Sequence, residues 1–172
     1  MAEIFEIILH QLVVISVFGN SVLLVVLAFL LAGLYLFRNK HIKTLIILCL
    51  TAASYTYSMY LKYLFMHPRP ESALDRVYSF DVYGFPSSHV LFYTSFWGFI
   101  IYLTFKYIKE EKLVLHIVRS IAAYLLLFIG ASRVVLGMHY VKDVVAGYLF
   151  GALFLSLMIW LDRQIPEIIS KD

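Results

Sequence analysis

The sequence predicts an all-α protein, a polytopic membrane helix bundle with a single domain over residues 1–172. Two features of the composition support this fold class. Hydrophobic residues make up 62% of the chain and charged residues only 15%, whereas soluble domains have about 45–50% and about 25%. A soluble fold of this size would leave too much apolar surface in water. The third observation is a set of five apolar stretches, each long enough to cross a bilayer as a helix, which takes about 20 residues.

Polar or proline-containing segments separate the five apolar stretches. Because lipid offers no hydrogen-bond partners, each stretch must satisfy its own backbone and is expected to be helical. The five transmembrane helices are predicted at residues 20–37, 44–65, 88–108, 113–133 and 140–161. The same composition excludes a disordered, collagen-like or disulfide-rich chain, and a net charge of only +3 argues against a nucleic-acid partner.

The N-terminal stretch, residues 3–18, is apolar but short. Glu3, Glu6 and His10 share one face of a helix at this spacing. Two interpretations stay open: a tilted sixth span, or an amphipathic helix that lies in the membrane interface. A cleaved signal peptide is disfavoured because the start is acidic and no small-residue cleavage site follows.

Lys and Arg residues predict the orientation in the membrane. With five alternating spans, nine of them fall on one side and five on the other. Positive charge marks the cytoplasmic side, so the side with five is expected to be periplasmic or extracellular. For a bacterial chain, this orientation corresponds to the inner (plasma) membrane with the site on the periplasmic or extracellular side.

Charged and histidine residues gather at the helix ends that this topology places on the external side. Ionisable residues near membrane depth are costly and usually functional. The sequence-distant segments contribute Lys62 and Arg69, then Ser87, Ser88 and His89, then Arg133, and finally His139 and Asp143. The loop of residues 66–87 joins two of these segments and is long enough to suggest a function.

These residue types fit phosphoryl transfer. The cations Lys62, Arg69 and Arg133 could orient a phosphate dianion, and the helix that opens after Ser87 offers free backbone N–H groups to an anion. His139 and Asp143 are four residues apart on one helical face, so the carboxylate could hold one imidazole nitrogen and leave the other to attack. His89 is then a second imidazole, able to protonate a leaving oxygen.

The spacing Lys62-x6-Arg69-Pro70, Pro86-Ser87-Ser88-His89 and Ser132-Arg133-x5-His139-x3-Asp143 closely resembles the three-part signature of the type 2 phosphatidic acid phosphatase family. The resemblance implies a six-helix membrane phosphatase that needs no metal or other cofactor. It implies His139 as the nucleophile that forms a phosphohistidine, Asp143 as its partner and His89 as the general acid. It also implies a list of phosphate binders: Lys62, Arg69, Ser87, Ser88 and Arg133. The family usually has Gly at the position of Ser88, and this added side chain could either narrow the pocket or supply a hydroxyl donor.

The expected function is hydrolysis of the terminal phosphate of a lipid phosphate or diphosphate at the outer face of the membrane. The first expected substrate is a bacterial envelope lipid, either lipid A 1-phosphate or undecaprenyl diphosphate. The alternatives are a phosphatidylglycerophosphate or phosphatidic acid phosphatase, a phosphatase of a soluble phosphate ester, and a channel or transporter lined by these charges. No residue distinguishes the lipid head groups, and the oligomeric state stays open.

Three further features receive plainer interpretations. Gly147 and Gly151 form a small-xxx-small pair on the last span, which predicts close helix packing within the bundle and not dimerisation. His67 is interpreted as an exposed loop histidine, with substrate contact as the open alternative. Lys142 lies next to the site and is interpreted as a solvated charge.

Overall fold

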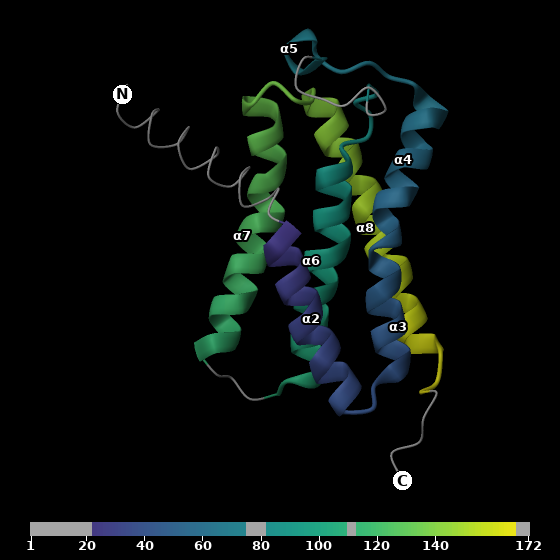
Figure 1. Cartoon of the computed structure of the whole chain (residues 1–172), viewed down its shortest axis with the longest axis vertical. Coiled ribbons are helices and arrows are strands. Elements are labelled where there is room, and N and C mark those ends of the chain that lie inside the picture. The colour runs from purple at the N-terminus through teal and green to yellow at the C-terminus, as the bar shows by residue number, and fades with distance from the viewer. Residues whose placement is uncertain (1–21, 75–81, 110–112, 168–172) are drawn as a thin grey trace.

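A computed structural model gives the structure of this chain and describes residues 22–74, 82–109 and 113–167. The described residues form helices and no strand, as the sequence predicts (Figure 1). In chain order the helices are α2 (Val22–Arg38), α3 (Ile42–Thr51), α4 (Ala53–Phe65), α5 (Glu71–Leu74), α6 (Ser88–Tyr107), α7 (Leu113–Val135) and α8 (Val141–Gln164). The N-terminal stretch at residues 3–18 lies outside the described residues.

Four of the five predicted spans are helices long and apolar enough to cross a membrane: Ile42–Phe65, Ser88–Tyr107, Leu113–Val135 and Val141–Gln164. The first predicted span corresponds to α2, whose 17 residues fall short of the about 20 that a straight crossing takes. The span Ile42–Phe65 is divided into α3 and α4 at Ala52. There the Thr51 hydroxyl donates to the Leu48 carbonyl over 2.6 Å, a back-bond that bends helices.

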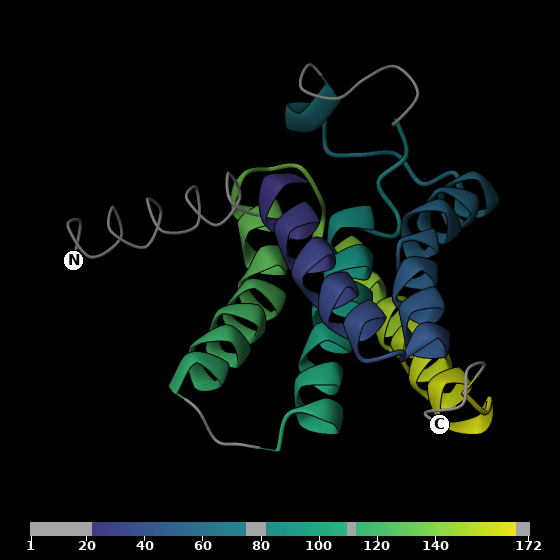
Figure 2. The same ribbon diagram turned by 60° about the horizontal axis from the view of Figure 1, so that its bottom comes forward.

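Helix α6 is the centre of the bundle. It packs against α7 and α8 and also contacts α3 and α4, and Figure 2 shows it enclosed by its neighbours. Val90, Leu91 and Phe99 on α6 have no exposed surface. The outer faces of the surrounding helices carry exposed apolar side chains such as Leu149 and Leu153 on α8, as expected where the neighbour is lipid.

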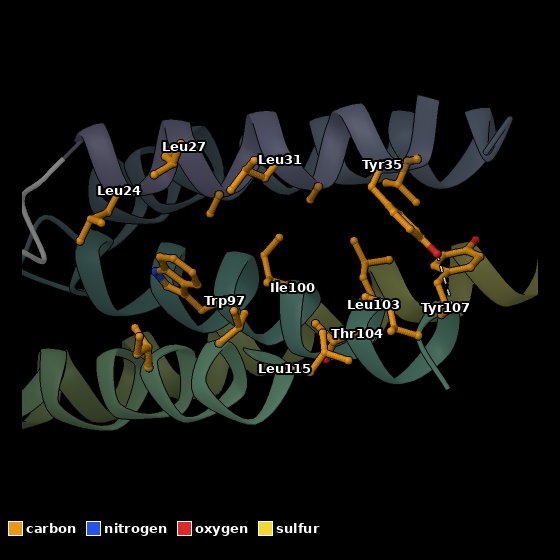
Figure 3. Close-up of a pocket in the computed structure, with 16 residues that line it drawn as sticks. Leu24, Leu27, Leu31, Tyr35, Trp97, Ile100, Leu103, Thr104, Tyr107 and Leu115 are labelled. Atoms are coloured by element: carbon orange, nitrogen blue, oxygen red, sulfur yellow. Dashed lines mark hydrogen bonds between the residues drawn. The ribbon is translucent and has the colours of Figure 1, made fainter. Parts of the chain in front are cut away.

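An apolar cavity of about 430 Å³ separates α2 from α6 and α7 (Figure 3). Leu27 and Leu31 of α2 face Trp97 and Ile100 of α6 across it. None of the predicted phosphate-site residues lines this cavity. The cavity and the polar site are therefore separate features of the bundle.

A buried carboxylate ties three helices together near the end of the bundle where α3 begins and α8 ends. Asp162 of α8 is 1% exposed. Its side chain accepts hydrogen bonds from Thr44 over 2.6 Å, from Tyr102 over 2.6 Å and from the Lys106 ammonium. Lys43 donates to the Asp162 carbonyl oxygen over 2.7 Å. Because each donor on α3 and α6 meets the same residue, this cluster fixes the spacing of α3, α6 and α8.

Gly147 and Gly151 allow α8 to lie directly against α6, as predicted. A Cβ atom at Gly147 would lie 2.9 Å from Val90 Cβ, and one at Gly151 would lie 2.7 Å from Thr94 Cβ and 2.9 Å from the Leu91 carbonyl oxygen. Real Cβ atoms do not approach other atoms so closely. The glycine pair therefore sets the distance between α6, which carries His89, and α8, which begins just after His139.

Replacing Gly151 by alanine is expected to lower the free energy of unfolding by about 1–3 kcal/mol, because the new methyl group overpacks the α6–α8 contact. The thermal unfolding midpoint of the detergent-solubilised protein measures this effect. Gly33→Ala is the matched control, since a Cβ there meets only Leu45 at an ordinary 3.6 Å. Equal midpoints for both variants would show that the glycine is not required for packing.

Candidate active site

Four helix ends meet at one end of the bundle, which we call the site end (Figure 1). They are the last turns of α4 and α7 and the first turns of α6 and α8. The connecting segments are joined by backbone hydrogen bonds: Ser87 N–H donates to the Asp143 carbonyl over 3.0 Å, and Gly84 N–H donates to the His67 carbonyl over 2.7 Å. The fold thus brings the sequence-distant motifs to one place.

His139 lies at the centre of this cluster and is 3% exposed. The Arg69 guanidinium donates through Nη1 to His139 Nε2 over 3.0 Å and to the Met138 carbonyl over 3.1 Å. On the other side of the ring, His139 Nδ1 lies 3.4 Å from Asp143 Oδ2. A guanidinium can only donate, so Nε2 must carry the lone pair and Nδ1 the proton. The contacts therefore select the imidazole tautomer in which Nε2 carries the lone pair.

Asp143 is held in place by the start of α8. Its Oδ2 also accepts from the Tyr140 backbone N–H over 3.0 Å, the contact that closes a capping box at the helix N-terminus. The turn before α8 depends on Gly137, whose φ of 66° is a left-handed value that glycine adopts at little cost. Local contacts of the turn and of the first residues of α8 therefore hold the His139–Asp143 pair in place.

The three predicted phosphate-binding cations are buried at the site end. Lys62 on the last turn of α4 is 1% exposed, Arg69 in the following loop is 6% exposed, and Arg133 on the last turn of α7 is 3% exposed. The charges of all three cations act on the imidazole of His89. The structure thus groups all three cations around the two histidines, as the sequence predicts.

Ser87 and Ser88 present donors at the first turn of α6. Both side chains are buried, and within the described part of the chain neither hydroxyl has a hydrogen-bond partner. Unsatisfied buried polar groups are costly, and a helix N-terminus also offers unpaired backbone N–H groups and the positive end of the helix dipole. This turn is therefore suited to an anion.

The pKa of His139 lies below the ordinary 6.5. Burial is the main cause, and the positive charges of Arg69 and Lys62 add to it against the opposing effect of the hydrogen bond to Asp143. The imidazole is consequently neutral at pH 7 and its Nε2 lone pair is available. No three His, Cys, Asp or Glu side chains group as a metal site in the described ranges.

Two features of the site were not predicted. A Cβ at Gly84 would lie 3.0 Å from Asp143 Oδ2 and 3.3 Å from Arg69 Cγ, so this glycine lets the loop lie directly against Asp143 and Arg69. Its place just before Phe85-Pro86 and the Ser87-Ser88-His89 motif could have drawn attention to it. The second feature is a contact between Lys142 and His67, which nothing in their sequence spacing indicates.

The sequence of this chain is similar to those of known phosphatases. Residues 42–166 match the PAP2 superfamily. The chain is 27% identical over 156 residues to phosphatidylglycerophosphatase B of Bacillus subtilis, covering 89% of this chain and 74% of that protein. It is 30% identical over 90 residues to lipid phosphate phosphatase delta of Arabidopsis thaliana, covering 52% of this chain but only 22% of the plant protein.

The fold also matches a solved structure, the first transmembrane PAP2 type phosphatidylglycerolphosphate phosphatase from Bacillus subtilis. The TM-score is 0.75 at 26% identity, over 94% of this chain and 80% of that one. The family match covers most of the chain and includes every predicted site residue. The chain therefore belongs to the PAP2 superfamily and is a membrane lipid phosphatase of the PAP2 type.

Proposed function

We propose that this phosphatase removes the terminal phosphate of a lipid by way of a phosphohistidine on His139. One observation carries the proposal: the Nε2 atom of His139 meets the Arg69 guanidinium while its Nδ1 meets Asp143. A nucleophilic nitrogen thus lies beside a cation suited to a phosphate oxygen.

The first chemical step is attack of His139 Nε2 on the phosphorus. The bond from phosphorus to the lipid oxygen breaks, and His89 gives its proton to that oxygen. Asp143 stabilises the positive charge that develops on the ring of His139. Arg69 must leave Nε2 for a phosphate oxygen, so substrate binding itself exposes the nucleophile.

The second step is hydrolysis of the phosphohistidine. Water attacks the phosphorus, His89 accepts a proton from it, and the bond from phosphorus to Nε2 breaks. Inorganic phosphate leaves and His139 recovers its neutral form. Both half-reactions therefore use the same two histidines, with His89 as general acid in the first and general base in the second.

The proposed phosphate binders are Lys62, Arg69, Arg133 and the first turn of α6. The buried hydroxyl of Ser88, which has no hydrogen-bond partner among the described residues, supports the hydroxyl-donor alternative over simple narrowing of the pocket. Ser87 offers the phosphate a second buried hydroxyl that has no hydrogen-bond partner among the described residues. Three cations can supply the charge stabilisation for which other phosphoryl-transfer enzymes use Mg²⁺.

The similarity to phosphatidylglycerophosphatase B supports phosphatidylglycerophosphate as the substrate. This reverses the order of our expectation from sequence, which placed lipid A 1-phosphate and undecaprenyl diphosphate first. The bias of nine against five positive charges supports a site on the external side of a bacterial inner membrane.

A panel of purified lipid phosphates tests the proposal, with released phosphate as the readout in detergent. Phosphatidylglycerophosphate is expected to react best, in the presence of EDTA as well as without it. A water-soluble ester of the same head group is the control for lipid dependence. Loss of activity with EDTA and recovery with Mg²⁺ would contradict the metal-independent chemistry.

The pH profile reports the protonation of His139. Only the neutral imidazole can attack, and its pKa lies below 6.5, so the acid limb of kcat/KM is expected below pH 6.5. Lys62→Gln removes one of the charges that lowers this pKa and is expected to move the acid limb upward in pH. An acid limb that shifts downward in this variant would contradict the assignment. His89 must be protonated for the first step, so the full profile is expected to be bell-shaped.

A further inference from the structure

Lys142 and His67 meet at the outer rim of the site. The Lys142 ammonium donates to His67 Nε2, while His67 Nδ1 lies 3.0 Å from the Pro68 carbonyl oxygen. A carbonyl oxygen only accepts, so Nδ1 carries the proton and Nε2 has the lone pair that receives the ammonium. The loop therefore fixes the tautomer that can hold the lysine.

Aromatic rings complete the support of this pair. The ring of His67 lies edge-on to Tyr140 with 6.2 Å between the ring centres, and 6.5 Å from the ring centre of Phe85. The Lys142 ammonium also lies 5.4 Å from the centre of the Tyr140 ring. An exposed lysine usually keeps its rotamer freedom, and losing it costs free energy. Here an exposed lysine is instead held in one place by a histidine and a tyrosine.

The pair lies one layer outward from the catalytic residues. Lys142 immediately precedes Asp143 on α8. The His67 carbonyl accepts from Gly84 N–H over 2.7 Å, and Gly84 in turn covers Asp143 Oδ2 and the Arg69 side chain. His67 therefore joins the segment that lies over Asp143 to the Lys142 ammonium.

The charge of Lys142 is not neutralised by the described part of the protein. The carboxylates of the ion pairs found there are Asp143, Asp162 and Glu167, and none of them pairs with Lys142. An ammonium uses one of its three donors on His67 and keeps two. A cation that the described residues do not neutralise, beside the proposed phosphate site, is suited to a second anionic group on the same ligand.

We propose that Lys142, positioned by His67, binds the inner phosphate of a lipid whose terminal phosphate lies at His139. This inference rests on the proposed function and adds to it a preference for lipids with two phosphates. In phosphatidylglycerophosphate the inner group is a phosphodiester, one glycerol away from the terminal phosphate. Phosphatidic acid has a single phosphate and leaves Lys142 without an anion.

The test compares Lys142→Gln with the wild type on phosphatidylglycerophosphate and on phosphatidic acid with identical acyl chains. The expected result is a loss of about tenfold in kcat/KM for the two-phosphate lipid, as for one hydrogen bond to a charged group. The value for phosphatidic acid is expected to change less than about twofold. Lys142→Arg should retain most of the activity, and Lys109→Gln, at an exposed lysine after α6, is the matched control.

His67 acts through Lys142, so His67→Ala is expected to raise KM for the two-phosphate lipid with little change in kcat. His67→Gln should restore part of the loss, because its amide oxygen can accept from the ammonium. An equal loss on both lipids, or no loss on either, would overturn the inference while the phosphatase activity itself stands. A wild-type protein that cleaves neither lipid would instead contradict the proposed function.

Discussion

Replacing His139 by alanine is expected to lower kcat for lipid phosphate hydrolysis by about 10⁴-fold or more, the loss typical of a removed nucleophile. No other described side chain combines a lone pair at the centre of the site with a hydrogen bond to a buried cation, as His139 has with Arg69. Phosphate release from detergent-solubilised enzyme measures the effect. His116→Ala is the control, since this histidine is exposed on α7 and the variant should keep wild-type activity. Full hydrolysis by His139→Ala would end the assignment of the nucleophile.

Replacing Asp143 gives the second largest expected effect, and its size depends on the substitute. Asp143→Ala removes both the acceptor that orients His139 and the charge that stabilises its cationic form, and is expected to lower kcat by about 10³–10⁴-fold. In Asp143→Asn the amide oxygen can still accept from Tyr140 N–H and from His139 Nδ1, the two contacts of Oδ2. Only the charge is lost, so a smaller fall of about 10²-fold is expected.

The same kcat measurement, made on both variants side by side, separates orientation from charge. Unfolding midpoints must accompany it because Asp143 is fully buried. If asparagine proved as damaging as alanine in a folded protein, the charge alone would account for the role of Asp143. If both variants kept wild-type rates, Asp143 would not be the partner of the nucleophile.

Hydropathy predicted the main spans because a lipid environment demands long apolar helices, and this demand is visible in local composition. It did not predict the break at Ala52, where the Thr51 hydroxyl donates to the Leu48 carbonyl. The Asp162 cluster also escaped prediction. Its partners come from α3 and α6, and their meeting depends on how the helices are rotated in the bundle.

The residues of the candidate site could be predicted because each is a costly charge or a polar group at a helix end. The contacts that these residues make with one another could not be predicted. The sequence predicts Arg69 as a phosphate binder, whereas the structure also places its guanidinium on His139 Nε2. The sequence predicts Lys142 and His67 as two separate residues on the surface, whereas the structure shows them in contact. Such contacts depend on the path of a loop, and the sequence pattern carries no information on that path.

A trapped phosphoenzyme tests the central claim most directly. The protein is mixed briefly with a lipid whose terminal phosphate is labelled, then quenched and analysed for label bound to the protein. The account predicts a phosphorylated protein that is labile in acid and stable in base, present in the wild type and absent in His139→Ala. Label that persists in acid, or that appears equally in His139→Ala, would contradict a phosphohistidine at this position.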